Sequence, residues 1–133
     1  MTDDISDLTI AVVDDDQRVL ESLQTLLESA DYAVRVFASG SALLESGCVA
    51  KIDGLISDIG MPGINGFDLL QELRAARPEL PIILITGHTA MLNLAPLIGV
   101  GYHRLFEKPF DGDELLAALG DALRSARVRK PQS

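Results

Sequence analysis

Carboxylate, hydroxyl and ammonium side chains end or follow short apolar runs at four places in this chain. They are Asp14, Asp15 and Asp16 at the first place, then Asp58, then Thr86, and finally Lys108. Carboxylates packed together repel one another, so at least one would hold a proton unless a cation lay between them. Oxygen ligands of this kind suit a hard divalent ion such as Mg2+, which keeps several of its waters. A magnesium site is therefore expected if the fold brings these side chains together.

The same side chains could carry out phosphoryl transfer, which relies on positioning and on neutralising the charge of the equatorial oxygens. A metal ion, the Lys108 ammonium and the Thr86 hydroxyl would supply those contacts, and Asp58 as nucleophile would form an acyl phosphate. Each residue also has a plainer role open to it. Asp16 is placed to cap the following helix, Asp58 could cap a loop, Thr86 could be an ordinary strand residue, and Lys108 could be a solvated charge.

The elements that must position these residues alternate along the chain. Short apolar runs indicate five strands, at 8–13, 32–37, 54–57, 81–86 and 103–107. Helical spacing and helix start and stop signals indicate helices at 16–30, 41–47, 66–76, 90–98 and 111–127, of which the fourth is weak. Candidate capping residues are Ser39 or Ser41, with Gly47 near the end of that helix, and Asp111 or Gly112 for the last helix.

Strands that are nearly all apolar imply a parallel sheet covered on both faces. Five strand–helix units predict a single α/β domain with a flavodoxin-like, doubly wound, five-stranded parallel sheet in the order 2-1-3-4-5. Ligands of such sheets bind outside the carboxyl ends of the strands. The first, third and fourth strands are neighbours in this order, so the polar residues at their ends should converge.

Composition excludes several classes of function. The chain has 133 residues, which suits one domain, and its net charge of −9 argues against direct binding of nucleic acid. Its one cysteine, Cys48, excludes an internal disulfide. The acidic start lacks the features of a signal peptide, and no apolar run approaches the ~20 residues that span a bilayer. These features predict a soluble, cytoplasmic protein with no membrane contact.

Four motifs carry a family resemblance. They are VVDDD at 12–16, SDIGMPGINGFDLL at 57–70, ILITGH at 83–88 and FEKPF at 106–110. Through these motifs the chain resembles the receiver domains of bacterial two-component response regulators along nearly its whole length. The MPGxxG loop and the TGH segment are most similar to the nitrogen-fixation regulator subgroup.

The resemblance implies a role for each site residue. Asp58 would be phosphorylated by a sensor histidine kinase, Thr86 would hydrogen-bond the phosphoryl group, and Lys108 would pair with it. The implied Mg2+ ligands are Asp14, which often acts through water, Asp15, Asp58 and the backbone carbonyl of Gly60. The Lys108–Pro109 bond would be cis. The chain would be a phosphoacceptor rather than an enzyme, with self-phosphorylation and autodephosphorylation as its own chemistry.

Two features depart from the family pattern. Many members carry an aromatic residue three positions before the active-site lysine, where this chain has Leu105, and the neighbouring Phe106 should face the opposite side of the strand. An aliphatic switch or an unusual output is therefore expected. The segment 87–102 contains no Asp, Glu, Lys or Arg, and Pro96 cannot lie inside a regular helix. Exposed apolar residues there would mark a dimer or partner interface, whereas an irregular backbone could instead bury most of them.

These observations predict a single-domain response regulator over residues 1–127, followed by a basic tail at 128–133. Too little chain follows residue 127 for a helix-turn-helix. If this is the entire protein, signalling is expected through protein contacts at the fourth helix and fifth strand; if it is part of a longer one, the basic tail begins a linker. The partner would be a downstream protein, a second receiver or another copy in a homodimer. The alternative is a pseudo-receiver that only binds or dimerises. An aspartyl-phosphate hydrolase is disfavoured, because Asp58-Ile59-Gly60 lacks the second Asp of a D-x-D motif.

Overall fold

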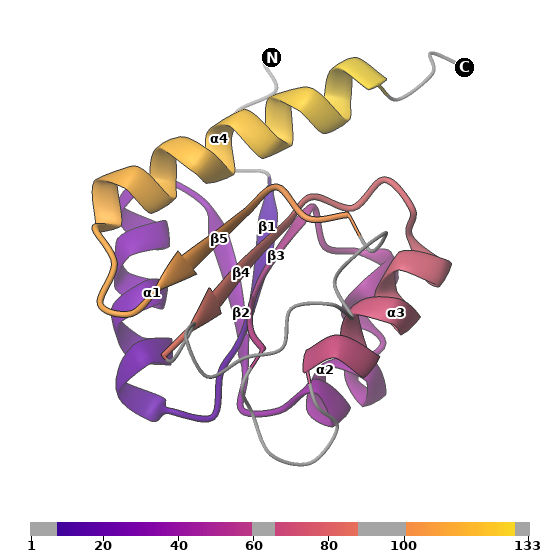
Figure 1. Ribbon diagram of the computed structural model, residues 1–133, viewed down its shortest axis with the longest axis horizontal. Coiled ribbons are helices and arrows are strands. Elements are labelled where there is room, and N and C mark those ends of the chain that lie inside the picture. The colour runs from indigo at the N-terminus through magenta and orange to yellow at the C-terminus, as the bar shows by residue number, and fades with distance from the viewer. Residues whose placement is uncertain (1–7, 60–65, 88–100, 130–133) are drawn as a thin grey trace.

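In the part of the chain that the structure describes, five parallel strands form one sheet in the order β2-β1-β3-β4-β5 (Figure 1). The computed structural model describes residues 8–59, 66–87 and 101–129. The strands are β1 (Thr9–Val13), β2 (Ala33–Phe37), β3 (Gly54–Asp58), β4 (Ile82–Thr86) and β5 (Arg104–Glu107). The predicted strand order and doubly wound fold are therefore confirmed.

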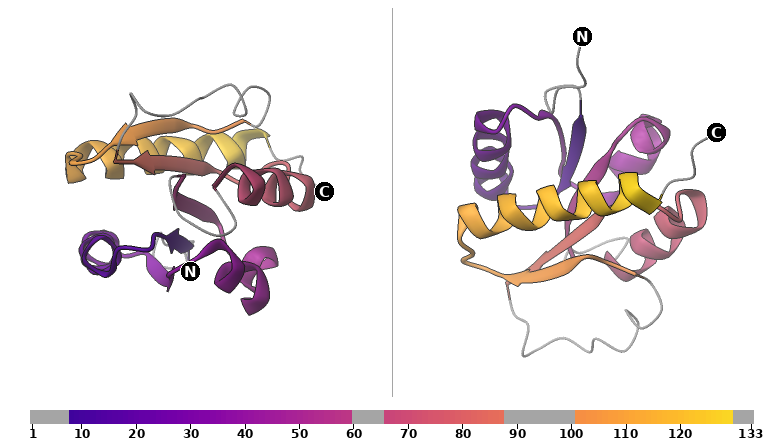
Figure 2. Two further views of the ribbon diagram at one scale, coloured as in Figure 1. Left: turned by 60° about the horizontal axis from the view of Figure 1, so that its bottom comes forward. Right: turned by 90° about the horizontal axis from the view of Figure 1, so that it is seen from above.

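Among the described residues, two helices cover each face of the sheet (Figures 1 and 2). Helices α1 (Gln17–Ser29) and α4 (Gly112–Arg129) pack on one face, and α2 (Gly40–Ser46) and α3 (Gly66–Ala76) pack on the other. A short 3-10 turn, η2 (Cys48–Ala50), follows α2. These helices lie close to the predicted ranges, whereas the helix predicted over 90–98 falls outside the described residues. No helix in the described part of the chain combines the length and apolar character needed to cross a membrane.

The core consists of two aliphatic layers separated by the sheet. Side chains alternate along β1, so that Val13 joins the layer under α2 and α3 while Val12 joins the layer under α1 and α4. The same alternation separates neighbours on β5. Leu105 packs against the α2–α3 layer, and Phe106 lies in the α1–α4 layer. The prediction that these two residues face opposite sides is therefore confirmed.

In the described segments, side-chain caps begin three of the helices, as the sequence predicts. Asp16 accepts a hydrogen bond from the Arg18 N–H at 3.0 Å and caps α1. Ser39 accepts one from the Ala42 N–H at 3.0 Å and caps α2. Asp111 accepts one from the Asp113 N–H at 3.0 Å at the start of α4. These caps fix where each helix begins relative to the strand before it.

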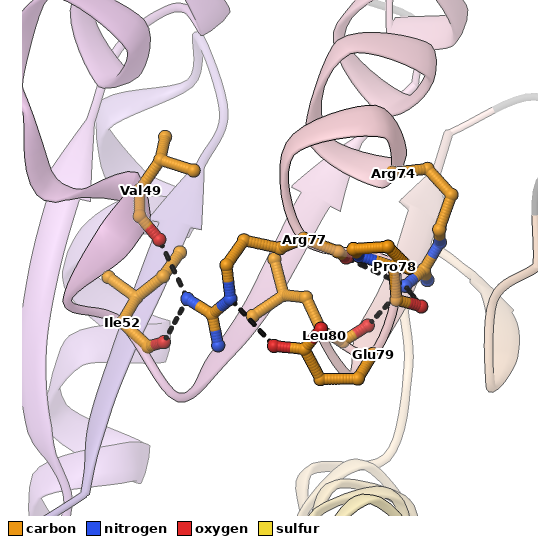
Figure 3. A network of polar contacts seen from close by, with 7 residues as sticks. All are labelled: Val49, Ile52, Arg74, Arg77, Pro78, Glu79 and Leu80. Atoms are coloured by element: carbon orange, nitrogen blue, oxygen red, sulfur yellow. Dashed lines mark hydrogen bonds and ion pairs between the residues drawn. The ribbon is translucent and has the colours of Figure 1, made fainter. Parts of the chain in front are cut away.

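Two arginines connect loops at the end of the sheet opposite the strand carboxyl ends (Figure 3). Arg74 lies in the last turn of α3, and Arg77 directly follows that helix. The Arg77 guanidinium donates to the carbonyls of Val49 and Ile52 at 2.8 and 3.0 Å and to the Glu79 carboxylate at 2.9 Å. Arg74 donates to the carbonyls of Arg77, Pro78, Leu80 and Gly101. Charge-assisted bonds of this kind hold the connections before β3, β4 and β5 in place.

Gly120 lies inside α4, and its replacement by alanine should stabilise the protein. A Cβ there would meet only the flexible end of Arg124, at 3.4 Å, and glycine costs about 0.5–1 kcal/mol relative to alanine inside a helix. Gly47→Ala is the contrasting variant. Gly47 has open space but a φ of +76°, so alanine should lower the free energy of unfolding by about 1 kcal/mol. Urea unfolding measures the change in the free energy of unfolding for Gly120→Ala and Gly47→Ala. Changes of the same sign in the two variants would contradict the expectation.

Candidate functional site

The carboxyl ends of three strands bring Asp14, Asp58 and Lys108 together. Asp14 directly follows β1, Asp58 is the last residue of β3, and Lys108 directly follows β5. The Lys108 Nζ lies 2.9 Å from Asp14 Oδ2 and 3.1 Å from Asp58 Oδ2. Since β4 separates β3 from β5, the lysine must reach across the end of β4. Its own N–H anchors it there by donating to the Thr86 carbonyl at 2.7 Å.

Asp14 is held by the backbone on two sides. Its N–H donates to the Phe37 carbonyl of β2 at 3.1 Å, and its Oδ1 accepts from the Asp16 N–H at 2.8 Å. Its Oδ2 is fully buried and forms an ion pair with Lys108, but the pair lacks the alignment of a hydrogen bond. A buried carboxylate oxygen in this position is suited to a cation.

Three carboxylates fit a hard divalent ion. Asp14, Asp15 and Asp58 each offer an oxygen, and these oxygens lie within 4.8 Å of one another. Asp14 and Asp58 are buried and Asp15 is exposed, so an ion there would keep a side open to water. This all-oxygen, partly open arrangement matches the preference of Mg2+. The Gly60 carbonyl lies outside the described residues.

Burial raises the pKa of the Asp14 carboxyl above its ordinary value. The Asp16 N–H and the Lys108 ammonium lower it but do not fully offset the loss of hydration, and the nearby Asp58 charge raises it further. Burial alone would lower the pKa of Lys108. The close contacts and negative charges of Asp14 and Asp58 outweigh that effect, so the pKa of Lys108 lies above its usual range. Lys108 is therefore cationic at neutral pH.

The raised pKa of Asp14 predicts a pH-dependent gain in stability for Asp14→Asn when no metal is bound. A folded protein with a raised carboxyl pKa holds the proton more tightly than its unfolded chain. The resulting stabilisation is full below the ordinary value of 3.8 and is lost as the pH rises through the raised pKa. Relative to Asp14→Asn, the wild type should therefore lose stability as the pH rises from about 3 towards neutral.

Urea unfolding of both proteins in the presence of a chelator measures this difference across the pH range. A difference that stays constant with pH would contradict the expectation. Saturating Mg2+ should favour the wild type at neutral pH, because a cation compensates the ionised carboxylate.

Thr86 lies one position beyond the residue that pairs with Asp58. In the register of β3 and β4, Asp58 pairs with Ile85, and Thr86 follows as the buried last residue of β4. Ser57 is a further buried polar residue, whose Oγ donates to the Asp58 carbonyl at 3.3 Å. No role for Ser57 is predicted above from the sequence, although this polar residue is unusual in the otherwise apolar run GLIS. The Lys108–Pro109 bond is cis, as predicted.

Known proteins resemble this chain over most of its length. A family model described as the response regulator receiver domain matches residues 10–120. The chain is 38% identical over 120 residues to the transcriptional regulatory protein FixJ of Azorhizobium caulinodans. It is 34% identical over 117 residues to FixJ of Bradyrhizobium diazoefficiens. These matches cover 90% and 88% of this chain but only 57% of each relative. The chain thus corresponds to little more than half the length of these relatives.

Solved structures show the same fold. A response regulator receiver domain protein from Clostridium thermocellum superposes with a TM-score of 0.82 at 26% identity, covering 92% of this chain and 99% of that one. A structure described as FixJ-N superposes with a TM-score of 0.76 at 28% identity, covering 93% and 96% respectively.

Proposed function

This chain belongs to the response regulator receiver domain family, and we propose that it accepts a phosphoryl group on Asp58 from a sensor histidine kinase in a Mg2+-dependent reaction. The observation that carries the proposal is the pairing of one lysine with two buried carboxylates, Asp14 and Asp58. Proteins of this family are phosphoacceptors rather than enzymes in the usual sense.

Each residue has a distinct part in the proposed transfer. An Asp58 carboxylate oxygen attacks the phosphorus of the donor, and the donor's nitrogen departs with the bonding electron pair and takes up a proton. The product is an acyl phosphate on Asp58. When bound, Mg2+ supplies positive charge to the phosphoryl oxygens. Its proposed holders are Asp14, Asp15, Asp58 and the Gly60 carbonyl.

Lys108 and Thr86 complete the proposed environment of the phosphoryl group. The Lys108 ammonium is 3.1 Å from Asp58 before transfer, and a small movement would allow it to pair with a phosphoryl oxygen. The Thr86 hydroxyl would donate a hydrogen bond to another oxygen. Neutralising the negative charge on the phosphoryl oxygens is the main source of rate acceleration in phosphoryl transfer.

The signal would leave the domain through protein contacts near β5. The described part of the proposed output face is β5 itself, where Leu105 packs against the α2–α3 layer. Leu105 would replace the usual aromatic side chain with an aliphatic one that responds to changes at Thr86. The curated relatives are transcriptional regulators by name. A downstream protein, a second receiver or another copy of this chain is the proposed partner.

Intact mass measurement tests the proposal. The protein is incubated with Mg2+ and a small phosphodonor such as acetyl phosphate, with and without a chelator. We expect a gain of one phosphoryl group that requires the metal. No gain under conditions that modify another receiver would refute the proposal and favour a receiver that acts by binding alone. A gain that persists in the chelator would refute the metal requirement.

A further inference from the structure

We propose that Asp16 is a positioning residue for the metal site, because by capping α1 it directs its own backbone N–H at the carboxylate of Asp14. The inference rests on the proposed function, since it concerns how a Mg2+ ligand is held. The role is indirect. Among the described residues, the carboxylates that gather within 4.8 Å are those of Asp14, Asp15 and Asp58, and Asp16 is not one of them.

Asp16 connects the site to the helix through its backbone and its side chain. The side chain accepts from the Arg18 N–H at 3.0 Å, and the carbonyl accepts from the Val19 and Leu20 N–H groups at 3.0 and 3.1 Å. Its own N–H donates to Asp14 Oδ1 at 2.8 Å. The backbone is extended, with φ −96° and ψ 112°, as is usual for a capping residue. The cap that starts α1 therefore also fixes the direction of this N–H.

The hydrogen bond to Oδ1 determines which way the Asp14 carboxylate faces. With Oδ1 held by the Asp16 N–H, Oδ2 is directed at Lys108, 2.9 Å away. The Asp14 side chain is fully buried, so any other orientation would leave an oxygen without this donor. Loss of the cap would allow the peptide between Asp15 and Asp16 to rotate. Ligands that lose such outer partners bind metals more weakly.

Asp16 could instead act through its negative charge alone, and two substitutions separate these possibilities. Asp16→Asn removes the charge but keeps an oxygen that caps a helix about as well as aspartate does. Asp16→Ala removes both. Asp111→Ala is the matched control. Asp111 is an acidic cap of the same kind at the start of α4, with its side chain on the Asp113 N–H and its carbonyl on the Leu115 N–H.

Calorimetric titration of the unphosphorylated proteins with Mg2+ provides the first readout. Asp16→Ala should weaken the Mg2+ affinity about tenfold, the lower end of the effect of removing a partner of a metal ligand. Asp16→Asn should bind like the wild type. Asp111→Ala should lose thermal stability as Asp16→Ala does but keep its Mg2+ affinity. Amide hydrogen exchange at Asp16 in the metal-free proteins is the second readout, with protection lost in Asp16→Ala and kept in Asp16→Asn.

Several outcomes would overturn the inference. If Asp16→Asn and Asp16→Ala weaken the Mg2+ affinity equally, then the charge of Asp16, and not its cap, supports metal binding. If Asp111→Ala weakens the Mg2+ affinity as much as Asp16→Ala does, then the effect comes from general helix stability. Wild-type affinity in Asp16→Ala would show that the cap does not position the ligand. If the wild type itself does not bind Mg2+, the metal requirement of the proposed function fails, and unchanged amide protection in Asp16→Ala then overturns the positioning role separately.

Discussion

The Asp58→Asn protein should gain no mass when it is incubated with Mg2+ and a phosphodonor under conditions that add one phosphoryl group to the wild type. An amide oxygen is not a nucleophile that can form an acyl phosphate, so the expected loss is complete. Asparagine has nearly the same shape as aspartate, and the side chain is largely buried at the end of β3. The substitution should therefore remove the chemistry and leave the sheet in place.

Asp111→Asn is the matched control for this experiment. Asp111 lies outside the carboxylate cluster among the described residues, and asparagine retains its cap. This variant should be phosphorylated like the wild type. A mass gain in Asp58→Asn, mapped by peptide mass to Asp14 or Asp15, would show that the phosphoryl acceptor had been misassigned within the cluster. A mass gain elsewhere in the chain would show that the cluster is not the acceptor site.

When no metal is bound, Lys108→Gln should lower the free energy of unfolding more than Asp58→Asn or Asp111→Asn does. The ammonium contacts two buried carboxylates at 2.9 and 3.1 Å, and glutamine would leave them without this shared charge. Breaking a buried ion pair by removing one partner costs about 3–5 kcal/mol, and the partial exposure of Lys108 favours the lower end. The loss should shrink as the pH falls through the raised pKa of Asp14, because protonation removes one of the charges that Lys108 neutralises.

Urea unfolding in a chelator, compared with Lys51→Gln, measures this effect. Lys51 is exposed in the turn before β3 and carries the same charge, so its replacement should change stability little. Mg2+ should recover much of the stability lost in Lys108→Gln, since the ion can replace the ammonium between the carboxylates. If Mg2+ does not reduce the difference in stability between the wild type and Lys108→Gln, then Lys108 stabilises the fold by packing rather than by charge.

The order of the strands and the ends that carry the site could be predicted because both depend on patterns visible in sequence. A run such as PIILIT at 81–86 has no polar face, which places β4 inside a covered parallel sheet. Parallel strands then collect their carboxyl ends at one edge. The caps at Asp16 and Ser39 followed from residue type at helix starts, because few side chains can satisfy the first free N–H groups.

The detailed geometry could not be predicted, because it depends on groups that every residue has or on rotamers. Arg74 and Arg77 donate to backbone carbonyls such as those of Leu80 and Val49, which leave no mark in the sequence. The pairing of Lys108 with Asp14 as well as Asp58 depends on how far a flexible side chain extends across β4. The role of the Asp16 N–H was also hidden, since the sequence identifies the capping side chain but not the direction of its amide.

The strand order also determines when the site can form during synthesis. Lys108 reaches Asp58 across 50 positions of sequence, and β5 can join the sheet only by pairing with β4. A nascent chain whose β5 is still inside the ribosome can bury parts of β1 and β3, yet Asp14 and Asp58 then face each other without their lysine. We expect such intermediates to be poor substrates for a kinase. Competence to accept a phosphoryl group would thus arrive only when β5 has joined the sheet.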